Sequence, residues 1–283
     1  MTDEQPADAA RRTVLLGGVA ALGLAACDTA SSPAGRGPSG PVGSVGPAGS
    51  ASPVPSGAPP AAGAPSSGAP TSSGAGPAVL RQPGADIASG SAASAAVALT
   101  FHGAGDLALT TRVLAVLAAA GARVTVFAVG QWLDANPAVG RQIVAAGHDL
   151  GNHTWSHQAM TSLSATAAED EIRRGADAVA RSVGAPGLLF RPSGTPASTA
   201  TIRAAAALAG YQRCISYDVD PEDFLDPGAP LVTSRTLSAV KAGSIVSLHL
   251  GHPGTADALP AILRGLADRR LRPASVTELL SHP

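Results

Sequence analysis

Residues 97–129 read VALTFHGAGDLALTTRVLAVLAAAGARVTVFAV and contain the pattern that decides the fold class. The apolar run Val97–Phe101 predicts a buried strand, and a second run, Val124–Val129, predicts another. Between them, apolar side chains recur at helical spacing over residues 107–120, and Gly121 is a helix-ending signal. A strand, a helix and a second strand in this order predict a parallel βαβ unit.

The same alternation continues toward the end of the chain. Helices are predicted at residues 137–146, 165–183, 199–209 and 256–268, and further strands at residues 188–190, 213–217 and 244–248. Short strands that alternate with helices predict an α/β fold in which a parallel sheet has its helices outside, and six or seven such units suggest a (β/α) barrel. In such barrels the catalytic residues come from loops at the carboxyl ends of the strands.

Unusual polar residues stand at the exits of these predicted strands. They are His102, His153, His157, Arg191, Asp218, Asp220 and His249. Four of the seven histidines of the chain are among them, and chance rarely gathers that many. The loops at one end of the predicted barrel are therefore the candidate site.

The composition changes sharply along the chain. Residues 1–100 contain no aromatic residue and no histidine, and Ala, Gly, Pro and Ser dominate them. Because a packed core needs large apolar side chains, residues 28–94 are predicted to be a low-complexity linker and residues 95–283 the folded domain. The formal net charge of −1 excludes a strong electrostatic attraction to nucleic acid.

The N-terminal segment, residues 1–27, has the features of an export signal. Arg11 and Arg12 precede an uncharged, mostly apolar run that is shorter than the roughly 20 residues of a membrane helix. The arginine pair resembles a twin-arginine signal, and the ending Leu24-Ala-Ala-Cys27 resembles the box of a bacterial lipoprotein. This resemblance implies lipidation at Cys27 and anchoring to the outer face of the cytoplasmic membrane. The alternative is a chance cysteine near a small-residue cleavage site.

The run His153-Thr-Trp-Ser-His157 places two imidazoles four residues apart. On a helical turn, positions i and i+4 share a face, so both rings can reach one metal ion. That spacing alone is a weak signal. The complete run Gly147-His-Asp-Leu-Gly-Asn-His-Thr-Trp-Ser-His157, however, resembles the metal motif of polysaccharide deacetylases, the NodB-homology domain of carbohydrate esterase family 4.

Other segments resemble further motifs of that family and stand in the family's order. They are Val97–Phe101, Phe190–Pro192, Tyr217–Phe224 and Ser244–His249. The resemblance covers residues 95–283 and implies a distorted (β/α) barrel. It also implies a metal-dependent hydrolase, usually a zinc enzyme, that removes N-acetyl groups from a cell-wall or chitin-like polysaccharide. The implied partner is an N-acetylated glycan such as peptidoglycan.

The resemblance implies roles for individual residues of this chain. His153 and His157 would hold the metal ion, and His249 would be the general acid. An aspartate in the fourth motif would raise the basicity of His249, and Asp220 is preferred to Asp218 for this role.

The third, fourth and fifth motifs would also supply the groove. Arg191 would orient the catalytic base. An apolar and aromatic lining would come from Pro192, Phe224 and Leu248.

The first motif departs from the family pattern Thr-Phe-Asp-Asp-Gly, whose two carboxylates are the base and a metal ligand. Here residues 100–106 read Thr-Phe-His-Gly-Ala-Gly-Asp, so both carboxylates are missing in register. His102 could act as the base, as a third nitrogen ligand, or as a groove residue that binds sugar. Asp106 could fold back to the metal or to Arg191, or it could cap the helix that begins near Leu107.

Three functions therefore stay open. Metal-dependent N-deacetylation is the leading one, a domain that binds glycan without hydrolysis is the second, and an esterase that acts on O-acetyl groups is the third. The position of Asp106 discriminates between the first two, because the binding function gains if Asp106 points away from His153 and His157. His148 is expected to be structural, and His252 to face solvent.

Overall fold

The computed structural model describes residues 76–281. The predicted export signal, the lipidation site Cys27 and most of the predicted linker lie outside the described residues. In the part of the chain that is described, no helix is long and apolar enough to cross a membrane.

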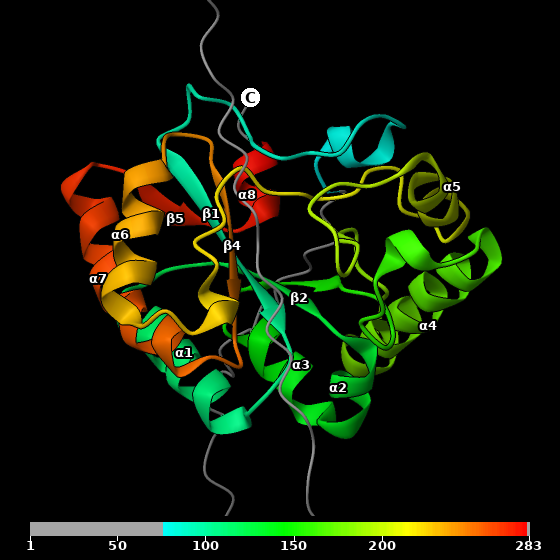
Figure 1. Cartoon of the computed structure of the whole chain (residues 1–283), viewed down its shortest axis with the longest axis horizontal. Coiled ribbons are helices and arrows are strands. Elements are labelled where there is room, and N and C mark those ends of the chain that lie inside the picture. The colour runs from blue at the N-terminus through cyan, green and yellow to red at the C-terminus, as the bar shows by residue number, and fades with distance from the viewer. Residues whose placement is uncertain (1–75, 282–283) are drawn as a thin grey trace, which may run out of the picture. The chain divides into compact units, whose positions relative to one another are not determined.

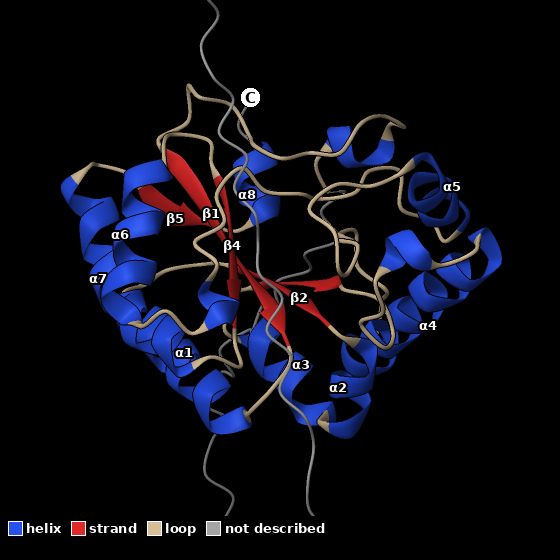
Figure 2. Cartoon of the chain, viewed as in Figure 1, coloured by secondary structure: helices blue, strands red, loops and turns tan. Residues whose placement is uncertain are grey.

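Helices surround a central set of parallel strands (Figure 1 and Figure 2). The strands are β1 (Ala96–Gly103), β2 (Thr125–Ala128), β3 (Asp149–Asn152), β4 (Ile245–His249) and β5 (Arg272–Ala274). The α-helices are α1 (Leu107–Ala119), α2 (Gly130–Ala135), α3 (Pro137–Ala145), α4 (Ala165–Val183), α5 (Ala200–Leu208), α6 (Ala229–Ala239), α7 (Pro253–Asp268) and α8 (Val276–Ser281). Three 3₁₀ turns accompany them: η1 (Ala78–Arg81), η2 (Met160–Ser162) and η3 (Asp223–Leu225).

The strands form a parallel sheet in the order β3-β2-β1-β4, and β5 pairs with the first residues of β1. The sheet continues around the far side through single bridges. Asn152 of β3 bridges to Phe190, and Val246 of β4 bridges to Val219. The carbonyl of Phe190 accepts a hydrogen bond of 2.8 Å from the amide of Ile215. Because single bridges replace regular strands on this side, the barrel is distorted. The prediction of an α/β fold of the barrel type is confirmed.

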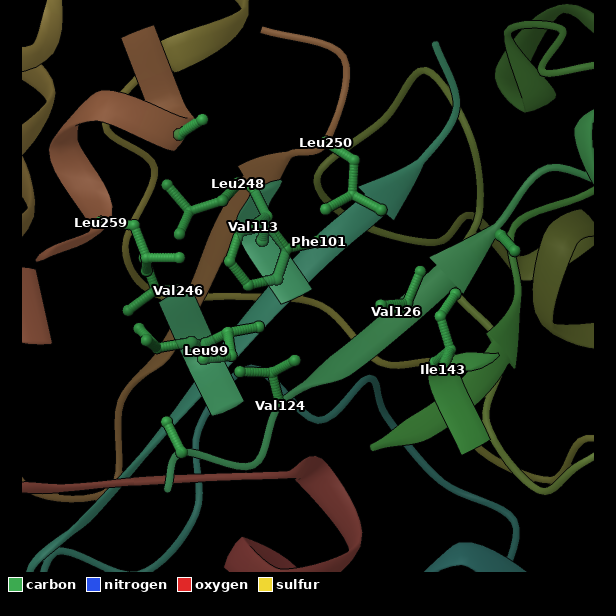
Figure 3. Close-up of a cluster of buried hydrophobic side chains, with 14 of the residues drawn as sticks. Leu99, Phe101, Val113, Val124, Val126, Ile143, Val246, Leu248, Leu250 and Leu259 are labelled. Atoms are coloured by element: carbon green, nitrogen blue, oxygen red, sulfur yellow. The ribbon is translucent and has the colours of Figure 1, made fainter. Parts of the chain in front are cut away.

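The main core lies between the sheet and the outer helices (Figure 3). Strand side chains such as Leu99, Phe101 and Val246 pack there against Val113 of α1 and Leu259 of α7, and all five are fully buried. The apolar strand residues and the apolar stripe of each outer helix pack against each other, and together they exclude water from the layer between sheet and helices. At the carboxyl ends of β1 and β4 the opposite face carries polar side chains, whereas at their amino ends it packs into a second apolar cluster.

Two predicted strands are shorter than expected. Residues 188–190 and 213–217 form only isolated bridges and single hydrogen bonds. The structure also contains β3, β5, α6 and α8, which the apolar pattern did not indicate. Short polar elements lack a clear period, so their pairing depends on neighbours that are distant in the sequence.

The folded part begins earlier than the predicted boundary at residue 95. Leu80 and Ile87 are buried, at 5% and 7% exposure, in an apolar cluster with Ile215 and Leu279. Ile87 also bridges to Ile215 in parallel. The few large apolar residues of this segment therefore belong to the domain, which the overall Ala, Gly and Ser content conceals.

Candidate functional site

Four imidazole rings meet at the carboxyl end of the parallel sheet. His102 is the penultimate residue of β1 and His249 ends β4, and the two are register partners in neighbouring strands. Their ring centroids lie 4.4 Å apart. The ring of His153, which follows β3, lies 4.2 Å from His102, and the ring of His157 lies 4.9 Å from His153. The predicted gathering of histidines at the strand exits is therefore what the fold produces.

A continuous chain of hydrogen bonds defines the tautomers of two of these histidines. Arg191 Nη1 can only donate, so His102 Nε2, 3.2 Å away, must accept. The neutral ring of His102 then carries its hydrogen on Nδ1 and donates to His249 Nε2 at 2.8 Å. His249 in turn donates from Nδ1 to Asp223 Oδ1 at 2.7 Å. Both ring nitrogens of His102 and of His249 are thus used within the protein.

Arg191 is the largest fully buried side chain of the domain. It donates to the carbonyls of Ile215 and Ser216, to Thr100 Oγ1 and to His102. All of these acceptors are uncharged, so no carboxylate pairs with the guanidinium directly. Burial lowers the pKa of Arg191 to about 9, although the charge of the more distant Asp220 opposes this shift.

Burial also controls the protonation of the imidazoles. It lowers the pKa values of His102 and His153 well below the ordinary value of histidine, and the neighbouring positive groups lower them further. Burial also lowers the pKa of His157, and the proximity of His249 adds to this effect. The four-ring cluster therefore favours neutral rings at these three positions, which is the form that offers lone pairs.

His153 has the orientation expected of a metal-binding histidine. Its Nδ1 donates to the carbonyl of Arg191 at 2.9 Å, which leaves Nε2 as a lone-pair donor. That Nε2 atom is buried and has no hydrogen-bond partner among the described residues. The ring of His157 lies beside it.

Glu171 of α4 holds the loop that carries these two rings. Its buried carboxylate accepts hydrogen bonds from the amides of Trp155 and Ser156, from Ser156 Oγ and from Gln158 Nε2. This support lets the loop adopt a positive φ of 61° at His157, which a non-glycine residue rarely adopts. Glu171 lies on an amphipathic helix, and nothing in the sequence indicated that its carboxylate supports the histidine loop.

The donors present do not fit the three-ligand metal site that the family resemblance implies. A catalytic zinc site uses three protein ligands and one open position. Among residues 76–281, no group of three His, Cys, Asp or Glu side chains is arranged to hold a metal ion. His153 and His157 supply two nitrogens, but His102 has both of its nitrogens engaged.

Asp106 does not supply the missing carboxylate. Its Oδ1 accepts hydrogen bonds from the amides of Ala108 and Leu109, at 2.7 Å and 3.0 Å, so it is the N-cap of α1. The ligand prediction is wrong and the cap alternative is confirmed, because the first amides of a helix have no acceptor within the helix.

Gly103 cannot supply a carboxylate either. The carboxylate position of the family pattern is also crowded here, since a Cβ atom at Gly103 would lie 2.8 Å from Val126 Cγ1.

Asp223, and not Asp220, is the carboxylate that holds His249. The prediction of Asp220 is wrong because its exposed side chain turns back and accepts from the amide of Glu222. Asp223 is fully buried and accepts from the backbone amide and Nδ1 of His249 and from Thr255 Oγ1. The tight turn of η3 brings Asp223 inward, which residue spacing alone does not reveal.

A groove of two connected cavities opens above the imidazoles. Phe224, His102, His157 and His249 line both cavities. The larger cavity, about 530 Å³, is also lined by Pro192, as predicted, and by Asp220 and Ser247 among others. The smaller cavity, about 380 Å³, lies on the side of His252.

The prediction that Leu248 lines the groove is wrong. Leu248 is fully buried in the main core, on the side of β4 that faces the helices (Figure 3). Side chains alternate along a strand, so His249 and Ser247 share the other face. Ser247 Oγ is buried, reaches the larger cavity and has no partner among the described residues. Strand alternation back from His249 was the signal that could have identified it.

His148 is buried, as expected of a structural residue. Neither of its ring nitrogens has a partner among the described side chains and backbone groups. Burial lowers its pKa, and Arg123 adds to this effect. It immediately precedes β3 and does not line the groove.

Comparison with known proteins agrees with this geometry. Residues 89–214 match the family model of the polysaccharide deacetylases. The peptidoglycan-N-acetylglucosamine deacetylase of Bacillus cereus is 34% identical over 190 residues, which are 66% of this chain and 88% of that protein. The chitooligosaccharide deacetylase of a Bradyrhizobium species is 31% identical over 159 residues, 56% of this chain and 71% of that protein.

A solved structure with the same fold is a carbohydrate esterase family 4 pseudoenzyme from Bacillus anthracis. It matches with a TM-score of 0.65 and 24% identity, over 69% of each chain. At this identity the likeness establishes the fold alone. Together with the sequence relatives and the motif order, the result is plain: the chain belongs to the polysaccharide deacetylase family, carbohydrate esterase family 4.

Proposed function

We propose that this domain binds an N-acetylated cell-wall or chitin-like glycan in its groove without the metal-assisted hydrolysis implied by the family motifs. The observation that carries this proposal is the state of His102. It replaces the first family carboxylate, and its two nitrogens are engaged by Arg191 and His249. The groove thus keeps its form, while the chemistry that would activate a water lacks a base and a third metal ligand.

The groove has the chemistry of a sugar-binding surface. Phe224 is 44% exposed and lines both cavities, so its ring offers a flat apolar face to a sugar ring. Asp220, which is exposed at the wall of the larger cavity, can bind hydroxyl or amide groups. The relatives named above act on peptidoglycan and chitooligosaccharide, which supports a β-linked N-acetylhexosamine polymer as the ligand.

Binding and acetate release measured on the same protein test this proposal. We expect N-acetylglucosamine oligomers to bind in calorimetry with or without added zinc, and no acetate to be released. Phe224→Ala should weaken binding about fivefold to tenfold, because the stacking face is lost. Leu225→Ala is the matched control, since Leu225 is 62% exposed and lines neither cavity. Absence of binding by the native domain would overturn the proposal.

The second candidate function is metal-dependent N-deacetylation. The buried, unpartnered Nε2 of His153 favours it, because such an atom is ready to bind a metal ion. Zinc-dependent release of acetate by the native protein, abolished in His153→Ala, would establish this candidate in place of the first. The same assay on an O-acetylated glycan covers the esterase function.

We also propose that the protein is an exported lipoprotein anchored through Cys27. The arginine pair and the lipoprotein-type box support it, and the cell-wall relatives are consistent with an extracytoplasmic site. Cys27→Ala should move the protein from the membrane fraction to the soluble fraction of cells. Cys214→Ala, which alters the buried cysteine of the domain, should leave the fractionation unchanged. Membrane association that survives Cys27→Ala would contradict the anchor.

A further inference from the structure

Two neighbouring His–Asp pairs lie beside the groove, and the rings of their histidines, His249 and His252, are 5.8 Å apart. Asp223 begins the 3₁₀ turn η3, and Asp226 follows its last residue as the C-cap, with a left-handed backbone (φ 50°). His249 ends β4, and His252 is the N-cap of α7. The inner pair, Asp223 with His249, is described above. The outer pair joins Asp226 Oδ1 and His252 Nδ1 at 2.9 Å.

The outer pair determines what His252 presents to the cavity. Because the carboxylate of Asp226 can only accept, Nδ1 of His252 carries the hydrogen. In the neutral ring, Nε2 is then a hydrogen-bond acceptor. His252 lines the smaller cavity, and its ring lies edge-on to that of His249 at 5.8 Å. The expectation that His252 faces only solvent is therefore wrong.

The rest of the smaller cavity suits an uncharged ligand with an apolar face. Its floor and wall include Ala104, Gly105, Val129 and Gly251. None of the described residues that line it is Lys, Arg, Asp or Glu. A charged substituent would lose its hydration there with no opposite charge in contact, which is unfavourable. A Cβ at Gly105 would lie 2.6 Å from Gly251 Cα, so the two backbone segments of this wall pack directly against each other.

From these contacts we infer that the smaller cavity is a second sugar subsite, in which His252 accepts a hydrogen bond from a hydroxyl or amide of an uncharged N-acetylhexosamine. This inference rests on the proposed glycan binding. Phe224 lines both cavities and stands between the two subsites as a shared apolar surface. One glycan chain would then cross the imidazole cluster from the larger cavity to the smaller one.

Structural stabilisation alone does not explain the outer pair. Asp226 has 61% of its side chain exposed, and exposed ion pairs contribute little to stability. What the pair does achieve is a single orientation of the His252 ring at the cavity wall. Asp226 is therefore a positioning residue, and His252 is the residue that contacts the ligand.

Oligomer length provides the test. Calorimetry with N-acetylglucosamine dimer and tetramer is performed on the native domain, on His252→Ala and on Asp226→Ala. We expect the native domain to bind the tetramer more tightly than the dimer. His252→Ala should weaken tetramer binding about tenfold, or about 1.4 kcal/mol, while dimer binding changes less than twofold. Asp226→Ala should produce a smaller loss in the same direction, because the ring stays but is no longer oriented.

A matched control lies on the same helix. Asp257→Ala removes an exposed carboxylate of α7 that pairs with Arg112 outside the groove, and it should change neither affinity. Unchanged tetramer binding in His252→Ala would overturn the inference, as would an equal loss for dimer and tetramer. If the native domain binds neither oligomer, the proposed function itself fails, and this result is distinct from the other two.

Discussion

Asp223→Ala is expected to lower the free energy of unfolding by about 3–5 kcal/mol. The carboxylate is fully buried and accepts from the amide of His249, from its Nδ1 and from Thr255 Oγ1. Removing it leaves these donors without an acceptor in a place that water does not reach, and each unsatisfied group costs about 1–3 kcal/mol. Urea denaturation at neutral pH measures the change.

The control for Asp223 is Asp220→Ala. Asp220 is exposed and accepts from the amide of Glu222 and from the half-buried Tyr217, so its removal should change stability by no more than about 0.5 kcal/mol. If Asp220→Ala lowered the free energy of unfolding as much as Asp223→Ala, the special role assigned to the buried Asp223 carboxylate would be refuted.

Restoring the two missing carboxylates is expected to raise the zinc affinity of the domain by on the order of a hundredfold. The variant combines His102→Asp and Gly103→Asp with Val126→Ala, because Val126 Cγ1 would otherwise lie 2.8 Å from the new Cβ. Loss of a mere partner of a metal ligand already changes affinity by about 10- to 100-fold, and a ligand itself matters at least as much. His102→Asp also places an anion beside the buried Arg191.

Competition with a chromophoric zinc chelator measures this gain. Val126→Ala alone is the control for repacking and should bind zinc as weakly as the native domain. Adding His153→Ala to the restored variant should remove most of the gain, because Nε2 of His153 is the buried free donor. Native zinc affinity equal to that of a folded, restored variant would refute the conclusion that the native donor set is incomplete.

The overall architecture could be predicted because it depends on a repeated local pattern. The apolar run at β1 and the stripe along α1 bury the same layer, so burial imposes strand and helix at those places whatever the rest of the chain does. Parallel strands then bring their carboxyl ends to one edge, which gathers His102, His153 and His249. The positions of these three histidines follow from periodicity and connectivity.

The interactions of the site residues could not be predicted in the same way. His102 was compatible with a base, a ligand or a sugar contact, and its two hydrogen bonds depend on Arg191 and His249, far away in the sequence. Likewise, the three-residue turn η3 places Asp223, and not Asp220, against His249. Asp106 caps the N-terminus of α1 and so does not reach the predicted metal-binding histidines.

Residue order and apolar period thus specify which residues reach the groove end of the barrel, since hydrophobic burial acts through local repeats. The tertiary structure decides which acceptor each donor finds. Hydrogen bonds are short and directional, so a displacement of a few ångströms, invisible in the sequence, separates a metal ligand from a helix cap. His252 is a further example: its hydrogen bond to Asp226 holds its ring at the wall of the smaller cavity, which the sequence did not indicate.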